Sequence, residues 1–217
     1  VKGPPEVVTL GQTLNSMAAS LQRSEKNRRA LTADIAHELR TPLAVQQANL
    51  EALEDGVYPL NQEALKPLRE QNELLIRLVE DLRTLSLADA GELELHKRPV
   101  DLRELTQLVT QSFEPALANN QITLQIESVG EMPKVMADQD RIQQILHNLL
   151  QNALRYTPAG QSIEITLQQE GKYVRLDLRD HGAGIPPEAV DLIFERFYRA
   201  DPSRERESGS TGLGLAI

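Results

Sequence analysis

Cysteine is absent from this chain of 217 residues. The protein therefore has no disulfides, no cysteine-ligated zinc or iron–sulfur cluster and no cysteine nucleophile. Aromatic residues are scarce, with four Tyr, three Phe and no Trp, which leaves few rings to stack on nucleic-acid bases. No apolar run approaches the roughly 18 residues of a membrane-spanning helix. The first residues do not have the pattern of a signal peptide, and we expect none at this point of the sequence.

Positive charge is also in deficit, with 23 Lys and Arg against 32 Asp and Glu and a formal net charge of −9. Because nucleic-acid phosphates require clustered Lys and Arg, we predict no nucleic-acid partner. The four histidines (His37, His96, His147 and His181) are too scattered for a two-histidine metal motif on one helix. The length suits one large or two small globular domains.

Two amphipathic helical patterns occupy the first ninety residues. Apolar side chains recur at steps of about three and four between Leu10 and Leu53, and again between Leu65 and Leu85, as in a coiled-coil seam. Gly and Pro within residues 55–59 end the first helix. The pattern predicts an antiparallel hairpin. One hairpin offers too little surface to bury both stripes, so we expect two copies to form a four-helix bundle.

The remainder of the chain mixes strand and helix signals from about residue 92. Alternating, strand-like segments are expected at 93–97, 122–127, 162–168 and 173–178. Helical segments are expected at 102–117 and after Asp138, a suitable capping residue, and Glu170-Gly171 suits a hairpin turn. Together these elements predict an α+β domain.

His37 stands out among the histidines because helical geometry directs it away from the apolar stripe of its helix. Thr41 follows one turn later on nearly the same face, and Glu38 lies between core and surface. Pro42 lacks an N–H and is expected to kink the helix. A carboxylate beside an imidazole can fix its tautomer and make the other ring nitrogen a better nucleophile. The alternative is an ordinary surface histidine in a charged helix.

Asn148 and Asn152 lie one helical turn apart, with Arg155 on a neighbouring face. Amide oxygens can ligate Mg²⁺, and an arginine can contact the phosphates that the metal bridges. Alternatively, both amides cap a turn or face solvent.

Two glycine-containing segments follow. Asp180 follows a predicted strand and comes just before Gly182 and Gly184, where a carboxylate could accept a hydrogen bond from an exocyclic amine. Taken alone, this pattern is common. Gly212 and Gly214 precede an apolar, helix-like end of the chain and could offer backbone N–H groups to phosphate. The segment matches neither a Walker loop nor a dinucleotide fingerprint.

In their order along the chain, these segments resemble the sensor histidine kinases of two-component signalling over essentially the whole length. Residues 36–43 look like that family's H box, 148–158 its N box, 180–186 its G1 box, 194–199 its F box and 209–215 its G2 box. Residues 6–17 resemble the end of a HAMP linker. The resemblance implies a dimeric four-helix bundle followed by an α+β two-layer sandwich of the GHKL (Bergerat) type. It divides the chain into a HAMP-like linker helix (1–22), a dimerisation and phosphotransfer hairpin (23–90) and a catalytic ATP-binding domain (91–217).

The resemblance also implies roles for individual residues in the H box. His37 would accept the γ-phosphoryl group of ATP. Glu38 would polarise the imidazole and assist proton movement. Thr41 would orient a water molecule for dephosphorylation of the partner regulator.

The nucleotide roles implied by the resemblance fall on the four later boxes. Asn152 would ligate Mg²⁺, Asn148 would support that site, Arg155 would face the phosphates and Tyr156 would line the adenine pocket. Asp180 would accept a hydrogen bond from the adenine amino group, and Gly182 and Gly184 would let the backbone close on the nucleotide. Gly212 and Gly214 would act as the hinge of a lid over the phosphates. Arg199 would contact the γ-phosphate. His181, in the variable position of the G1 box, is expected to be a plain loop residue.

The function implied is a protein-histidine kinase that uses Mg²⁺ and ATP, forms homodimers and passes its phosphoryl group to an Asp on a response regulator receiver domain. Two alternatives stay open: a dimeric scaffold that binds nucleotide without turnover, and another GHKL-type ATPase. The chain stops at Ile217, where the family has further helix and strand, so we expect it to be the cytoplasmic piece of a longer membrane receptor.

Overall fold

The computed structural model describes residues 5–199 and 211–217. They form two compact units, Val1–Arg77 and Leu78–Ile217. The predicted features at 1–4 and 200–210, among them the start of the HAMP-like segment and Gly209 of the G2 box, lie outside the described residues.

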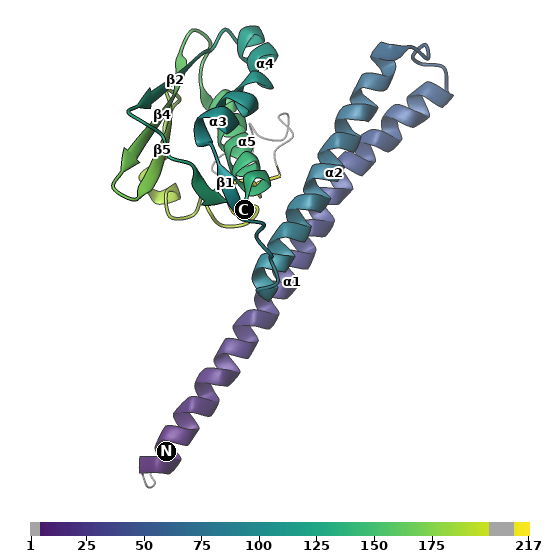
Figure 1. Cartoon of the computed structure of the whole chain (residues 1–217). Helices are drawn as coiled ribbons and strands as arrows, with labels where there is room; N and C mark the ends of the chain where they lie inside the picture. Colours follow the sequence, from purple (N-terminus) through teal and green to yellow (C-terminus); the bar gives the residue numbers. More distant parts are fainter. Residues whose placement is uncertain (1–4, 200–210) are drawn as a thin grey trace. The chain divides into compact units, whose positions relative to one another are not determined.

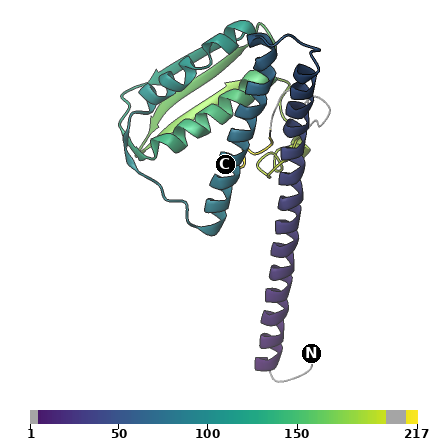
Figure 2. The same ribbon diagram turned by 90° about the vertical axis from the view of Figure 1, so that its right-hand side faces the viewer.

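The first unit is a helical hairpin made of α1 (Pro5–Glu54) and the first part of α2 (Gln62–Ala90) (Figures 1 and 2). Gly56 ends α1 with φ +70°. The N–H of Gly56 donates to the carbonyl of Leu53 at 3.2 Å, and that of Val57 to the carbonyl of Ala52 at 2.9 Å, the bond pattern of a Schellman cap. Asn61 opens α2 by accepting the Ala64 N–H at 2.8 Å. The predicted break at 55–59 is confirmed.

Helix α1 continues through Pro42 as a single element. The sequence predicts a kink there because proline removes a helical hydrogen bond and crowds the preceding turn. The helix is not interrupted, and the ring of Pro42 is buried.

The second unit contains the end of α2 and every strand found among the described residues. In chain order it comprises β1 (Arg98–Val100), α3 (Leu102–Gln111), α4 (Glu114–Asn119), β2 (Thr123–Val129), β3 (Val135–Ala137), α5 (Gln139–Tyr156), β4 (Ser162–Glu170), β5 (Tyr173–Asp180) and a 3₁₀ turn, Pro187–Ala189. The predicted α+β class is confirmed, and the structure adds strand β3, which was not predicted.

Strands β2, β4 and β5 form the main sheet, in the order β2-β4-β5. β2 runs parallel to β4, and β4 pairs antiparallel with β5 from Glu170↔Tyr173 to Ile163↔Asp180. Helices α3 and α5 lie together on one face of this sheet (Figures 1 and 2). β1 and β3 form a separate antiparallel pair.

The core lies between that sheet face and the two helices. Alternation along β4 directs Ile163, Ile165 and Leu167 inward, where each is at most 1% exposed. From α5, Leu146 and Leu150 meet them at 2% and 1% exposure. Because the buried face of α5 fixes this helix against the sheet, the residues of α5 outside that face are also held at defined positions.

Two predicted elements need correction. The strand expected at 93–97 is absent, and the strand lies at 98–100, where Val100 pairs with Val135 and is buried. The helix expected over 102–117 is two helices, because Pro115 in α4 would clash with the carbonyl of Gln111 in a continuous helix, and α3 ends at that residue.

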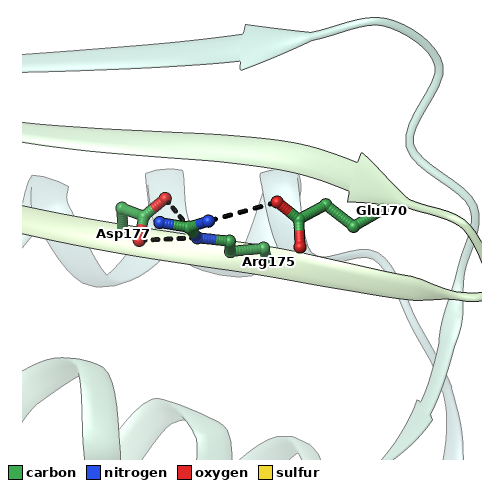
Figure 3. Close-up of polar contacts among 3 residues, drawn as sticks. All are labelled: Glu170, Arg175 and Asp177. Atoms are coloured by element: carbon green, nitrogen blue, oxygen red, sulfur yellow. Dashed lines mark hydrogen bonds and ion pairs between the residues drawn. The ribbon is translucent and has the colours of Figure 1, made fainter.

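The β4–β5 hairpin carries an ion cluster on its outer surface (Figure 3). Arg175 contacts Glu170 through Nη1 at 3.1 Å and Asp177 through Nε at 2.9 Å. The two carboxylates raise the pKa of Arg175. All three side chains are about half exposed, so solvent screens the cluster and it adds little to stability.

Candidate functional site

The first unit presents His37 on the surface of α1. His37 is exposed and Glu38 is half-buried, as the helical pattern predicts. Thr41 is also exposed, and its Oγ1 lies 3.5 Å from the carbonyl oxygen of His37. The imidazole, the carboxylate and the hydroxyl therefore occupy one accessible stretch of helix.

The second unit builds its candidate site on α5, whose first turn is held by Asp138. The Asp138 carboxylate accepts from the N–H groups of Asp140 and Arg141 at 3.1 and 3.2 Å, and from that of His96 at 2.9 Å. These donors favour the charged carboxylate, the His96 N–H most, and so lower the pKa of Asp138. The predicted cap is confirmed.

Asn148, Asn152 and Tyr156 follow one another at single-turn spacing along α5. The Asn148 side chain donates through Nδ2 to the carbonyl of Gly214 at 2.9 Å. A Cβ added to Gly214 would lie 3.4 Å from Asn148 Cγ, so the N box and the G2 box touch here. Asn152 is half-buried one turn further on, and Tyr156 is 48% exposed.

The G1 box passes close to the C-terminal end of α5. Asp180 is the last residue of β5, and its Oδ1 accepts the N–H of Gly182 at 2.9 Å. A Cβ on Gly182 would lie 2.6 Å from the carbonyl oxygen of Tyr156. Only glycine permits this approach. Gly184 has φ +76°, which also favours glycine.

The F box and the G2 box are joined through their backbones. The N–H of Phe197 donates to the carbonyl of Gly212 at 2.8 Å. A Cβ on Gly212 would lie 2.9 Å from Phe197 Cα, and Gly212 has φ +66°. Leu213 beside it is fully buried. Arg155 and Arg199, the two predicted phosphate contacts, are half-buried in this unit.

The end of α2 is attached to the F box by an ion pair that the sequence did not reveal. Arg196 donates through Nη1 to Asp89 Oδ2 at 2.7 Å and through Nη2 to Asp89 Oδ1. The pair lowers the pKa of Asp89 and raises that of Arg196. Because the partners are 107 residues apart, no sequence signal joins them.

Two of the remaining histidines contact other parts of the second unit. The ring of the half-buried His147 has its centroid 4.9 Å from that of Phe113, a core residue. His181 was expected to be a plain loop residue, but its Nδ1 lies 3.0 Å from the carbonyl oxygen of Ser162 on β4. Strand alternation could have revealed this contact, since it places His181 and Asp180 on opposite faces of β5.

The second unit therefore brings the N, G1, F and G2 boxes together around the end of α5. Among the described residues no group of three or more His, Asp or Glu side chains could hold a metal. A cation here would be held by an amide oxygen together with ligand phosphates, a donor set that suits Mg²⁺. At Gly182 the missing side chain lets the G1 box approach both the Tyr156 carbonyl and the Asp180 carboxylate. The fold and site define an α+β domain that follows a helical hairpin with an exposed histidine.

Comparisons with known proteins agree with this class. The family described as His Kinase A (phospho-acceptor) domain matches residues 27–91, and the family described as histidine kinase-, DNA gyrase B-, and HSP90-like ATPase matches residues 137–217. The signal transduction histidine-protein kinase BaeS of Escherichia coli (strain K12) is 42% identical over 212 residues, which are 98% of this chain and 45% of BaeS.

Solved structures resemble the chain over most of its length. The histidine kinase AdeS of Acinetobacter baumannii is 34% identical, with a TM-score of 0.68, over 83% of this chain and 82% of that one. Histidine kinase ThkA, in a crystal structure with the response regulator protein TrrA, is 26% identical, with a TM-score of 0.62, over 84% of this chain and 55% of that one.

The chain belongs to the sensor histidine kinases. It spans less than half the length of the curated relative BaeS. Within the described ranges, no helix combines the length and apolar character needed to cross a membrane.

Proposed function

We propose that this chain transfers the γ-phosphoryl group of ATP to His37 and then passes it to an Asp of a response regulator. The main support for this proposal is that two features occur in one chain. His37 is exposed, with Glu38 next to it, on the hairpin that matches the phospho-acceptor family. The four later boxes come together in the domain that matches the ATPase family. The similar kinase ThkA was crystallised with a response regulator protein, which supports a receiver domain as the partner.

For the phosphoryl transfer, one ring nitrogen of His37 forms a bond to the γ-phosphorus as the bond to the ADP oxygen breaks. Glu38 holds the proton on the opposite ring nitrogen and draws it away as positive charge develops there. Accessibility of the ring is the structural requirement, because the donor must approach in line.

The nucleotide roles follow the four boxes. Asp180 would accept a hydrogen bond from the adenine amino group, and Tyr156 would line the base pocket. Arg155 and Arg199 would contact phosphates, and the glycines of the G2 box would cover them. Asn152 would hold Mg²⁺, which supplies neutralisation of phosphate charge when bound. Asn148 would act by holding Gly214, the contact that it makes in the structure.

Dimerisation is part of the proposal. Leu14, Met17, Leu21, Leu43 and Leu50 of the predicted seam are 46 to 73% exposed, and a second hairpin would bury them. Thr41, one turn after His37, would orient water for the reverse task of removing phosphate from the regulator. We also propose the division into 1–22, 23–90 and 91–217, and that the chain serves as the cytoplasmic part of a longer receptor.

The test is incubation of the chain with γ-³²P-ATP and Mg²⁺. We expect acid-labile, base-stable label on the wild type and none on His37→Ala. His96→Ala is the matched control, because His96 is exposed and contributes only its backbone N–H to Asp138. Label that persists in His37→Ala would refute the assignment. ATP binding without any label in the wild type would favour a scaffold instead.

A further inference from the structure

His181 lies where β5 ends and the G1 box begins. Along β5, Leu176 and Leu178 pack against the core, and Asp180 shares their face by alternation. His181 shares the opposite face with Arg179. Asp180 and His181 therefore point to different sides of the sheet. Asp180 points to the side that carries α5, and His181 points to the opposite side.

The ring of His181 extends the pairing between β4 and β5 by one residue. The backbone ladder ends at Ile163↔Asp180, so His181 is opposite Ser162. There Nδ1 lies 3.0 Å from the carbonyl oxygen of Ser162. A carbonyl oxygen carries no hydrogen, so a hydrogen bond here needs the tautomer with its proton on Nδ1; the Oγ of Ser162 lies 3.4 Å from the same nitrogen. Nε2 lies 3.8 Å from Glu164 Oε1, a second and longer polar contact on the same strand.

We propose that His181 is a positioning residue for the adenine contact of Asp180. This inference rests on the proposed nucleotide role of Asp180. The Asp180 carboxylate is exposed and stands at the very end of the ladder. Its Oδ1 accepts a hydrogen bond from the Gly182 N–H at 2.9 Å. On the opposite face of the sheet, the His181 ring ties the backbone next to Asp180 to Ser162 of β4. Together these contacts fix the position from which the Asp180 carboxylate accepts a hydrogen bond.

The proposal predicts a loss of base discrimination rather than a general loss of binding. ADP carries an exocyclic amine on its base, and IDP carries a carbonyl oxygen at that position. We expect wild type to prefer ADP. In His181→Ala, ADP affinity should fall about 5-fold, the equivalent of one ordinary hydrogen bond. IDP affinity should stay within about 2-fold, since IDP does not use the Asp180 contact.

Isothermal titration of the full chain with ADP and with IDP, each with Mg²⁺, measures both affinities. His181→Asn supplies the rescue, because its amide nitrogen takes a place near that of Nδ1 and can donate to Ser162. His181→Gln reaches further and should not restore the preference. Equal losses for ADP and IDP, an unchanged preference in His181→Ala, or an Asn variant as poor as Ala would each overturn the proposal. Thermal unfolding of every variant confirms that the chain is folded.

Asp180→Asn separates this inference from the proposed function beneath it. If Asp180→Asn retains the wild-type preference for ADP, the adenine assignment of Asp180 fails, and the inference fails with it. If Asp180→Asn abolishes the preference while His181→Ala keeps it, only the positioning role of His181 fails. In the expected result both changes reduce the preference, and the double variant loses no more than Asp180→Asn alone.

Discussion

Asp138 shows how one side chain can set the position of a functional helix. Its carboxylate accepts hydrogen bonds from N–H groups in the first turn of α5 and from the N–H of His96, which lies just before β1. The residues of the N box lie on that helix, so the position of its first turn affects the position of their side chains. At the scale of single residues, changes of pH and single substitutions give the clearest tests.

The lowered pKa of Asp138 makes part of the stability depend on pH. Its carboxyl titrates below the ordinary value of 3.8 in the folded chain. The stabilisation is complete well above that value and is lost as the pH falls through the folded-state pKa. We expect the difference in thermal midpoint between wild type and Asp138→Asn to be full at neutral pH and to shrink below about pH 4. A difference that is independent of pH would contradict this prediction.

Gly182 tests the close approach between the G1 box and α5. In Gly182→Ala the new methyl would lie 2.6 Å from the Tyr156 carbonyl oxygen, and the loop must move. We expect ADP affinity to fall by about 10-fold, measured by isothermal titration.

Gly171→Ala is the matched control for Gly182→Ala. Gly171 has φ +61°, and nothing lies within 4 Å of an added Cβ. The strain should cost about 1–2 kcal/mol of stability and leave ADP affinity as it is. Weaker ADP binding in Gly171→Ala would mean that a loss of stability alone weakens binding, so that the Gly182 result would not need the clash as its explanation.

At the scale of elements, side-chain hydrogen bonds join the end of α2 to the rest of the second unit. Asp89 pairs with Arg196, Thr84 accepts from Arg141 at 3.1 Å, and Asp81 accepts from Gln144 at 3.4 Å. The first contact reaches the F box and the other two reach α5. The end of this helix therefore contacts both segments that carry proposed phosphate-binding residues.

A double-mutant cycle on Asp89→Asn and Arg196→Gln measures the first of these contacts. Since the side chains are 52% and 33% exposed, we expect a coupling energy of only about 0.5–1 kcal/mol. Urea unfolding of the four proteins supplies it, and 1 M salt should reduce it. Arg175→Gln is the control arginine, and its effect should add to that of Asp89→Asn without coupling. Equal coupling for both arginines would argue against a specific pair.

The elements themselves were largely predictable from the sequence. Apolar periodicity together with Gly56 and Asp138 predicted the C-terminal end of α1 and the start of α5, because these signals act within a few residues. The strand near residue 98 was misplaced, since its position depends on pairing with β3. Likewise, the direction of His37 followed from helical geometry. The hydrogen bonds from Asn148 to Gly214 and from Phe197 to Gly212 could not be predicted from the sequence, because only the fold brings those residues together.

At the scale of the whole molecule, the apolar seam of the hairpin has a direct consequence for assembly. Leu43 and Leu50 stand seven residues apart on α1 and are 51% and 46% exposed. We expect the double variant Leu43→Glu, Leu50→Glu to shift sedimentation from dimer to monomer, because four charges would enter the bundle. Leu60→Glu, 79% exposed in the hairpin loop, is the control and should remain dimeric. A dimeric double variant would place the interface elsewhere.

Helix α5 also has a consequence for how this site tolerates change. Asn148, Asn152 and Tyr156 are spaced four residues apart, and the first and last of them contact the G2 and G1 boxes. A single residue inserted before Asn148 would turn all three by about 100° at once. A substitution removes one contact of this site at a time, whereas an insertion that rotates part of α5 would break several of its contacts at once. In descendants of this chain, insertions and deletions should accumulate in the surrounding loops and be excluded from α5.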